Sequence, residues 1–191
     1  MEIKITAQEI VDKKDEIRFK MVHYHPGIEE YHVGRRVFSD LYAYYGIAIL
    51  KDGDETASTI LNESLLKAME ITEEDAYSIA MKNMEADADI LDFLGMTVLS
   101  NGSRVNGACQ MLNISKLQEM ANNFEDDLCI IPSSIHEVII MPKKFLKGDD
   151  VKSMICEVNH NEVLPEEVLS DHPYYFSRKE GNVYEELTDW I

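Results

Sequence analysis

The residues that could do chemistry are concentrated first in the stretch 131–142, IPSSIHEVIIMP, which brings two serines, a histidine and a glutamate together. A serine beside a histidine could act as a nucleophile with its base. The proline and the serines favour a turn between two β-rich runs instead, and neighbouring side chains on a strand point to opposite faces, so His136 and Glu137 cannot cooperate directly. Neither an H-E-x-x-H zinc pattern nor a G-x-S-x-G elbow is present. The stretch therefore predicts a β-hairpin in which His136 is structural, with a Ser134–His136 unit as the catalytic alternative.

A second group of histidines lies in HYHPGIEEYH, residues 23–32, which also contains two glutamates. In an extended strand, His23 and His25 lie on one face, where imidazole ligands could hold a metal ion. A polar strand end followed by a loop explains the same residues without a metal, and we favour that interpretation. A metal-dependent or hydrolytic enzyme that uses His23, His25, His32 or His136 is therefore the alternative function.

Carboxylates form a third group, EADADILD, at residues 85–92. Its Asp-x-Asp spacing occurs in calcium loops, but the central glycine and the distal glutamate of an EF-hand are missing. The segment therefore favours a solvated acidic connection. Asp171 and His172 are neighbours, which by itself does not predict a dyad, and no phosphate-binding glycine motif is present. We expect no cofactor.

The chain is strongly acidic, with 36 Asp and Glu against 18 Lys and Arg in 191 residues, a net charge of −18. The charge is uneven, because residues 51–100 hold 12 acids and 3 bases, and residues 151–191 hold 9 acids and 3 bases. Direct binding to nucleic acid through a basic face, or to an anionic membrane, is disfavoured because both require Lys and Arg to neutralise phosphate. A basic protein partner fits this charge.

Periodicity predicts the elements that must position these groups. Strands are expected at 2–6, 16–23, 42–50, 55–60, 96–100, 128–131, 135–141, 174–177 and 183–186. Helices are expected at 7–14, 62–69, from Thr72 to Met84, behind a Ser115–Gln118 capping box, over 151–158 and from Pro165. Hairpin-like strand pairs beside separate helices predict an α+β fold, a largely antiparallel sheet with amphipathic helices packed against it.

Two helical stripes and three cysteines are the candidate core residues outside the strands. The stripes are Leu117, Met120, Ala121 and Phe124, and Val151, Met154, Ile155 and Val158. Cys109, Cys129 and Cys156 lie far apart in apolar contexts, so we expect buried reduced thiols and a reducing cytoplasm.

The length predicts a single domain, 1–191, with residues 1–36 as a candidate small N-terminal subdomain. The sequence has no run of 18 apolar residues, so no membrane span is expected. The first residues, MEIKITAQEI, lack the basic start and apolar stretch of a signal peptide. We therefore expect a cytoplasmic protein.

Three blocks of the C-terminal half resemble the signature blocks of an uncharacterised family, a domain of unknown function. They are LSNGSRVNGACQML, DLCIIPSSIHEVIIMP and EVNHNEVLPEEVLSDHPYYF. The order of elements from Tyr42 to Met84 is also similar, so the resemblance covers roughly residues 38–178. It implies a distribution in anaerobic gut bacteria, often on mobile elements and phages, and it implies no reaction and no catalytic residues.

From the charge and this implied distribution we expect a non-catalytic protein-interaction module that inhibits a nucleic-acid-binding host defence nuclease by DNA mimicry, in the manner of an anti-CRISPR protein. Acidity that only keeps the protein soluble is the alternative explanation of the same charge. Duplex DNA carries one charge per roughly 1.7 Å, so 18 charges match about 30 Å of duplex. A compact chain of this length has a radius of gyration of roughly 16 Å, a comparable span. The residues expected to bind the basic surface of the partner are Glu73, Glu74, Asp75, Asp87 and Asp89. The oligomeric state does not follow from the sequence.

Overall fold

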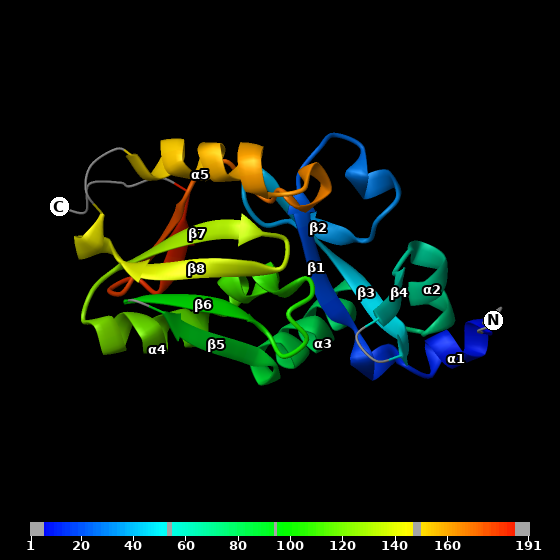
Figure 1. Cartoon of the computed structure of the whole chain (residues 1–191). Helices are drawn as coiled ribbons and strands as arrows, with labels where there is room; N and C mark the ends of the chain where they lie inside the picture. Colours follow the sequence, from blue (N-terminus) through cyan, green and yellow to red (C-terminus); the bar gives the residue numbers. More distant parts are fainter. Residues whose placement is uncertain (1–5, 53–54, 94, 147–149, 186–191) are drawn as a thin grey trace.

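The structure, a computed structural model, describes residues 6–52, 55–93, 95–146 and 150–185, so almost all of the strand expected at 2–6 lies outside it. Two sheets lie side by side, with helices packed on them (Figure 1). Every strand pairing among the described residues is antiparallel. This arrangement confirms the predicted α+β class.

The N-terminal sheet is organised around one long strand, which pairs with three shorter ones. Its strands are β1 (Arg18–His23), β2 (Gly34–Arg36), β3 (Leu41–Asp52) and β4 (Glu55–Ile60). The apolar run of β3 gives the sheet two buried faces, because Tyr45 packs toward the helices whereas Tyr42 and Tyr44 pack on Ile28 on the other side. Residues 18–36 thus contribute to the same sheet as β3, and the predicted domain division stays a prediction.

The C-terminal sheet has six strands in the order β10-β9-β7-β8-β6-β5. Its strands are β5 (Ala88–Phe93), β6 (Met96–Asn101), β7 (Leu128–Ser134), β8 (Glu137–Pro142), β9 (Tyr174–Ser177) and β10 (Asn182–Tyr184). One face of this sheet shares a core with Met21 and Leu41 of the N-terminal sheet. This shared core holds the end of β2 and the start of β3 close to β9.

Five α-helices and five short 3-10 turns complete the described fold. The helices are α1 (Ala7–Val11), α2 (Glu63–Ala68), α3 (Glu73–Ala86), α4 (Ile114–Phe124) and α5 (Asp150–Glu162). The 3-10 turns are η1 (Lys14–Glu16), η2 (Ile28–Glu30), η3 (Gly107–Leu112), η4 (Lys143–Phe145) and η5 (Pro165–Glu167). Among the described residues, no helix is long and apolar enough to cross a membrane.

Helix α4 confirms its predicted stripe. Leu117, Met120 and Ala121 are buried, and Phe124 packs partly buried against the same core. The predicted Ser115–Gln118 capping box is wrong, however. The helix begins two residues earlier, because the Asn113 side chain accepts the Lys116 backbone N–H at 3.1 Å.

The stripe predicted on α5 is confirmed for Ile155 and, partly buried, for Val151, and is wrong for Met154 and Val158. Ile155 is buried at 3% exposure, but Met154 is 47% and Val158 is 43% exposed. The helix lies on the outer face of the C-terminal sheet, where Ile155 contacts Cys129 and Ile131. A helix on the outer layer buries one narrow line of side chains, so only part of a wide apolar stripe reaches the sheet.

Two predicted strand boundaries need correction. The acidic segment 85–94, interpreted as a connection, contains strand β5, which pairs with β6 through a tight turn at Gly95. The predicted hairpin at 131–142 is confirmed, but its turn lies at Ile135 and His136 rather than at Pro132–Ser134. A register shift between Pro132 and Ser134 lets the proline stay within β7, since a bulge tolerates the missing N–H.

The predicted burial of the cysteines is confirmed for two of the three. Cys109 and Cys129 are buried, and burial raises the pKa of each thiol to about 12. Cys156 is exposed on α5, which contradicts its predicted burial. Like Met154, Cys156 lies on the side of α5 that faces solvent, so its burial was wrongly predicted for the same reason.

Candidate functional site

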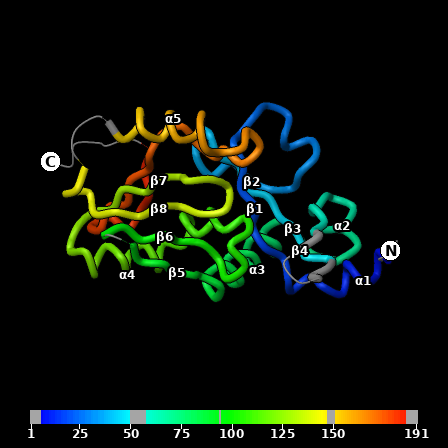
Figure 2. Tube along the Cα trace, in the orientation of Figure 1, coloured from blue at the N-terminus to red at the C-terminus, as the bar shows by residue number. Residues whose placement is uncertain are grey.

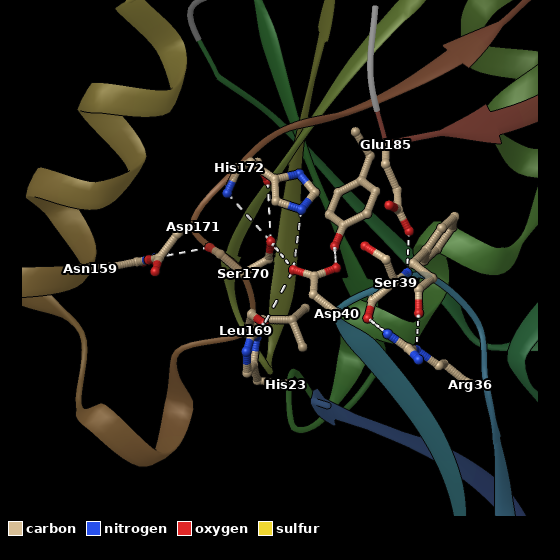
Figure 3. A network of polar contacts seen from close by, with 12 residues as sticks. His23, Arg36, Ser39, Asp40, Asn159, Leu169, Ser170, Asp171, His172 and Glu185 are labelled. Atoms are coloured by element: carbon tan, nitrogen blue, oxygen red, sulfur yellow. Dashed lines mark hydrogen bonds and ion pairs between the residues drawn. The ribbon is translucent and has the colours of Figure 1, made fainter. Parts of the chain in front are cut away.

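The most connected polar cluster of the described residues surrounds Asp40, in the turn between β2 and β3 (Figure 3). Its Oδ2 accepts a hydrogen bond from Ser170 Oγ at 2.6 Å and lies 3.2 Å from His172 Nε2. Its Oδ1 accepts a hydrogen bond from the Tyr174 hydroxyl at 2.5 Å. The three partners come from the segment that leads into β9, more than a hundred residues away in the sequence.

The protonation of His172 follows from its neighbours. Its Nδ1 lies 3.0 Å from the carbonyl oxygen of Pro173, and its Nε2 faces the Asp40 carboxylate. Both groups accept only, so both ring nitrogens must donate, and the ring is an imidazolium cation. The hydrogen bond to Asp40 raises the pKa of His172 above its usual value, against the opposing effect of burial.

The same contacts keep the Asp40 carboxylate ionised. Burial alone would raise the pKa of this carboxyl, but the hydrogen bonds from His172, Ser170 and Tyr174 together outweigh it and hold the pKa well below its usual value. Burial and the hydrogen bond to Asp40 also raise the pKa of Tyr174 far above its usual value. The cluster is therefore a carboxylate–imidazolium ion pair with two neutral donors.

The arrangement differs from a nucleophile–base unit. A serine nucleophile gives its proton to a neutral histidine nitrogen, and the carboxylate orients the far side of that ring. Here Ser170 donates directly to Asp40 and is 1% exposed, and His172 has no lone pair left to take a proton. These contacts connect the β2–β3 turn to the segment before β9.

Further contacts support the turn that carries Asp40. The Asp40 carbonyl accepts the Tyr24 backbone N–H at 2.6 Å, and the Arg36 guanidinium donates to the carbonyls of Phe38 and Ser39. The Glu185 carboxylate accepts the backbone N–H of Ser39. The turn is thus fixed from both sheets.

His136 is bound in a second, separate contact. Its Nδ1 accepts the Asn106 backbone N–H at 3.1 Å, so the proton sits on Nε2, which lies 3.2 Å from a carboxylate oxygen of Glu167. No partner acid was visible from the local sequence, because Glu167 is 31 residues further along the chain. The ring connects the β7–β8 turn to the loop before η3 and to η5, and Ser134 binds its backbone rather than its ring.

The three N-terminal histidines do not converge. His23 Nδ1 contacts the carbonyl of Leu169 at 3.2 Å and lies 4.0 Å from Asp40 Oδ2. His32 Nδ1 contacts the carbonyl of Ile28, and its ring packs on Tyr44. His25 is exposed. Within the described ranges, no group of three or more His, Cys, Asp and Glu side chains is arranged to hold a metal ion.

The five acids predicted to bind a partner each have a local role. Arg35 donates to Glu73 and Glu74, and the Tyr45 hydroxyl also donates to Glu73. Asp75 closes the α3 capping box with Thr72, whose backbone N–H and hydroxyl both donate to it.

The remaining two predicted acids form ion pairs. Asp87 pairs with Arg18 at 2.5 Å, and Asp89 pairs with Arg104 at 2.7 Å. Figure 2 shows α3 and β5 on the lower side of the molecule and α5 on the upper side. The acids of α3 and β5 therefore lie on a different side of the molecule from those of α5.

Two hollows accompany these features. A cleft of about 540 Å³ lies between β1 and the loop 101–110, with Arg18, Lys20 and Asp87 among its lining residues. Its charged groups already pair, since Arg18 binds Asp87 and Lys20 donates to Ser58 at 2.5 Å. A second hollow of about 480 Å³ lies between the β5–β6 hairpin and α4.

Fold and site together define an antiparallel α+β protein whose two sheets are joined by a partly buried carboxylate–imidazolium pair. Residues 84–178 match the model of a family described as "Family of unknown function (DUF5688)". This segment of the chain is thus similar to an uncharacterised family, as the resemblance led us to expect, although the match begins at 84 rather than near 38. No curated protein and no solved structure matches the chain significantly.

Proposed function

We propose that the protein is a non-catalytic interaction module that binds a basic surface of a protein partner through its carboxylates. The observation that carries this proposal is the net charge of −18, with twice as many acids as bases. Opposite charges on two surfaces accelerate their encounter and reject partners of the wrong sign. The proposal extends to a partner that itself binds nucleic acid, such as a host defence nuclease, whose basic channel an acidic protein can occupy in place of DNA.

The outer side of α5 and η5 supports such a role. Glu157, Glu162 and Glu166 are exposed, and among the described residues none of these carboxylates has a hydrogen bond or an ion pair. Glu157 and Glu162 share helix α5 with the exposed side chains of Met154 and Val158. Carboxylates without internal partners lose nothing inside the protein when a cation approaches, so this surface fits a basic and partly apolar partner.

The acids predicted from the sequence form a second candidate set, on the other side of the molecule. Glu73, Glu74, Asp75, Asp87 and Asp89 already hold Arg35, Thr72, Arg18 and Arg104. A partner cation would have to share them with these groups. Neutralising this set also removes internal contacts, so its effect on binding must be read against its effect on stability.

The test is inhibition of a purified RNA-guided DNA nuclease, measured as loss of DNA binding in a gel-shift assay across a salt series. The proposal predicts inhibition that weakens as salt rises, because screening shortens the reach of surface charges to about 8 Å at physiological ionic strength. The triple variant Glu157→Gln, Glu162→Gln and Glu166→Gln should inhibit less while melting at the wild-type temperature.

A matched control is the five-residue variant of the second set, with Gln or Asn at each position. Equal inhibition by wild type and by both neutralised variants would remove charge as the cause. Absence of inhibition for this and for other basic nucleic-acid-binding nucleases would leave the carboxylates as a solubilising surface.

A further inference from the structure

Strand β5 is an open edge of the C-terminal sheet. Among the described residues it pairs with β6 alone, at the lower border of the sheet in Figure 1. The Gly102 backbone N–H donates to the Asp87 carbonyl, which fixes the phase of the ladder. Residues 87, 89, 91 and 93 therefore bond toward β6, and the N–H and C=O groups of Ala88, Ile90 and Asp92 point away from the sheet.

Three of the six side chains of this edge are large, apolar and exposed, and they lie beside Asp89 and Asp92. Ile90 is 39%, Leu91 is 48% and Phe93 is 59% exposed. Natural sheets usually protect an open edge with charges, proline or a covering segment, and exposed apolar side chains beside open backbone groups mark a place where another chain can add.

The hollow beside this edge has a matching chemistry. It lies between the hairpin and α4, and Met96, Met120 and Phe124 supply apolar walls. Two carboxylates, Asp92 and Glu119, also line it, and no Lys or Arg does. Thr97 donates a hydrogen bond to Asp92 at 2.7 Å, and Lys116 pairs with Glu119 at the exposed surface of α4. Both carboxylates remain exposed to solvent beside these partners.

We propose that β5 binds an extended segment of a partner protein by strand addition, and that this segment combines apolar side chains with at least one Lys or Arg. The apolar side chains enter the hollow beside α4, and the cation meets Asp92 and Glu119. The open backbone groups of Ile90 and Asp92 select an extended segment rather than a helix, because only a strand offers N–H and C=O groups in register. The inference rests on the proposed function, since both require a basic protein partner.

A second copy of this chain fits the edge poorly. An antiparallel pair of β5 strands can be centred on Ile90, which places Ala88 of one copy opposite Asp92 of the other. Each copy brings a net charge of −18, however, and each strand carries Asp89 and Asp92, so two copies repel each other. A strand that carries Lys or Arg meets no such repulsion.

The test uses the full chain and a fluorescent nine-residue peptide of repeating Val-Val-Lys-Lys, in which both faces of the extended chain carry Val and Lys together. Fluorescence anisotropy at low salt should show binding that weakens as salt is added. The same peptide with Glu in place of Lys should not bind. Equal binding of the two peptides, or no binding of the Lys peptide, would overturn the proposal.

A matched pair of variants separates backbone pairing from side-chain contact. Ile90→Pro removes an outward N–H and leaves the ladder to β6 intact, and proline is tolerated on sheet edges. Ile90→Ala keeps that N–H and shortens the side chain. Strand addition predicts a loss of affinity of about tenfold for Ile90→Pro and about threefold or less for Ile90→Ala. Equal losses for both would refute pairing through the backbone.

If Ile90→Pro does not fold, hydrogen exchange of the wild-type protein decides the question. Strand addition slows exchange of the Ile90 and Asp92 amides when the Lys peptide is added, whereas docking of side chains alone leaves both amides fast. The outcomes for the two proposals remain distinguishable. If wild type and Ile90→Pro bind the nuclease equally, β5 is rejected as the site and the proposed function is kept. If the peptide binds but the nuclease is not inhibited, the nuclease-inhibitor function is rejected and β5 is kept as a peptide-binding edge.

Discussion

Removing the Asp40 carboxylate should destabilise the fold more than removing any neighbouring acid. In Asp40→Ala, the Tyr174 hydroxyl and the Ser170 hydroxyl lose their charged acceptor, and both residues are almost fully buried. A hydrogen bond to a charged group contributes about 1.5–3 kcal/mol, so the two donors together account for about 3–6 kcal/mol. The Asp40 side chain is 18% exposed, so water can reach part of the space left behind.

We therefore expect a loss of about 3–4 kcal/mol in the free energy of unfolding, toward the lower end of that range. For a chain of this length the melting temperature should fall by about 10 °C. The assay is urea denaturation followed by circular dichroism, with the m-value checked for constancy. Tyr174→Phe should cost about 1.5–3 kcal/mol alone and be clearly non-additive with Asp40→Ala, because both changes remove the same hydrogen bond.

The control is Asp171→Ala, which removes an exposed acid near the cluster. Its carboxylate accepts a hydrogen bond from Asn159 at 2.9 Å, so we expect a cost below about 1 kcal/mol. Equal stability losses for Asp40→Ala and Asp171→Ala, or additive effects of Asp40→Ala and Tyr174→Phe, would show that the cluster does not join the two sheets.

Three further predictions follow from the same contacts. The pKa of His172 is raised in the folded protein, so its contribution to the free energy of unfolding is complete below about pH 6.5 and is lost as the pH rises through the folded pKa. The pKa of Asp40 is lowered, so its contribution is complete above about pH 4 and is lost as the pH falls toward the folded pKa. The stability difference between wild type and His172→Gln should thus be largest between about pH 4 and 6.5 and shrink by pH 9; a constant difference in urea midpoints would contradict this. Phe124→Ala should cost about 2–3 kcal/mol and Met154→Ala less than about 1 kcal/mol, because the first is packed in the core and the second is largely exposed, and equal thermal melts would contradict it. His136→Ala should cost about 1–3 kcal/mol and speed amide exchange in the loop that its ring binds, whereas unaltered exchange would show that the ring is not an anchor.

Local pattern was sufficient to predict most elements of the fold. The start of α3 at Thr72, the apolar run of β3 and the spacing of α4 all depend on a few neighbouring residues, so the sequence displays them directly. Strand β5 was missed because its carboxylates resemble a solvated connection, although Ile90, Leu91 and Phe93 lie among them.

Long-range contacts could not be predicted in the same way. Asp40 meets Ser170 and Tyr174 across 130 and 134 residues of sequence, and nothing near Asp40 indicates which side chains will surround it. The adjacent pair Asp171–His172 offered a signal, but the acid that binds His172 is Asp40 rather than its neighbour. The exposure of Met154 was missed for a related reason, because periodicity predicts an apolar face without stating how much of it another element covers.

The position of Asp40 outside the family segment also bears on where the folding unit begins. Ser170, His172 and Tyr174 lie within the matched residues 84–178, but the carboxylate that satisfies them, and the Met21 and Leu41 side chains that complete the core, come from the first fifty residues. A fragment that begins at residue 84 would carry three hydrogen-bond donors without their acceptor, and the apolar side chains that Met21 and Leu41 cover would be exposed. A family match that begins at residue 84 therefore leaves out the acceptor of these three donors and part of the core that they adjoin.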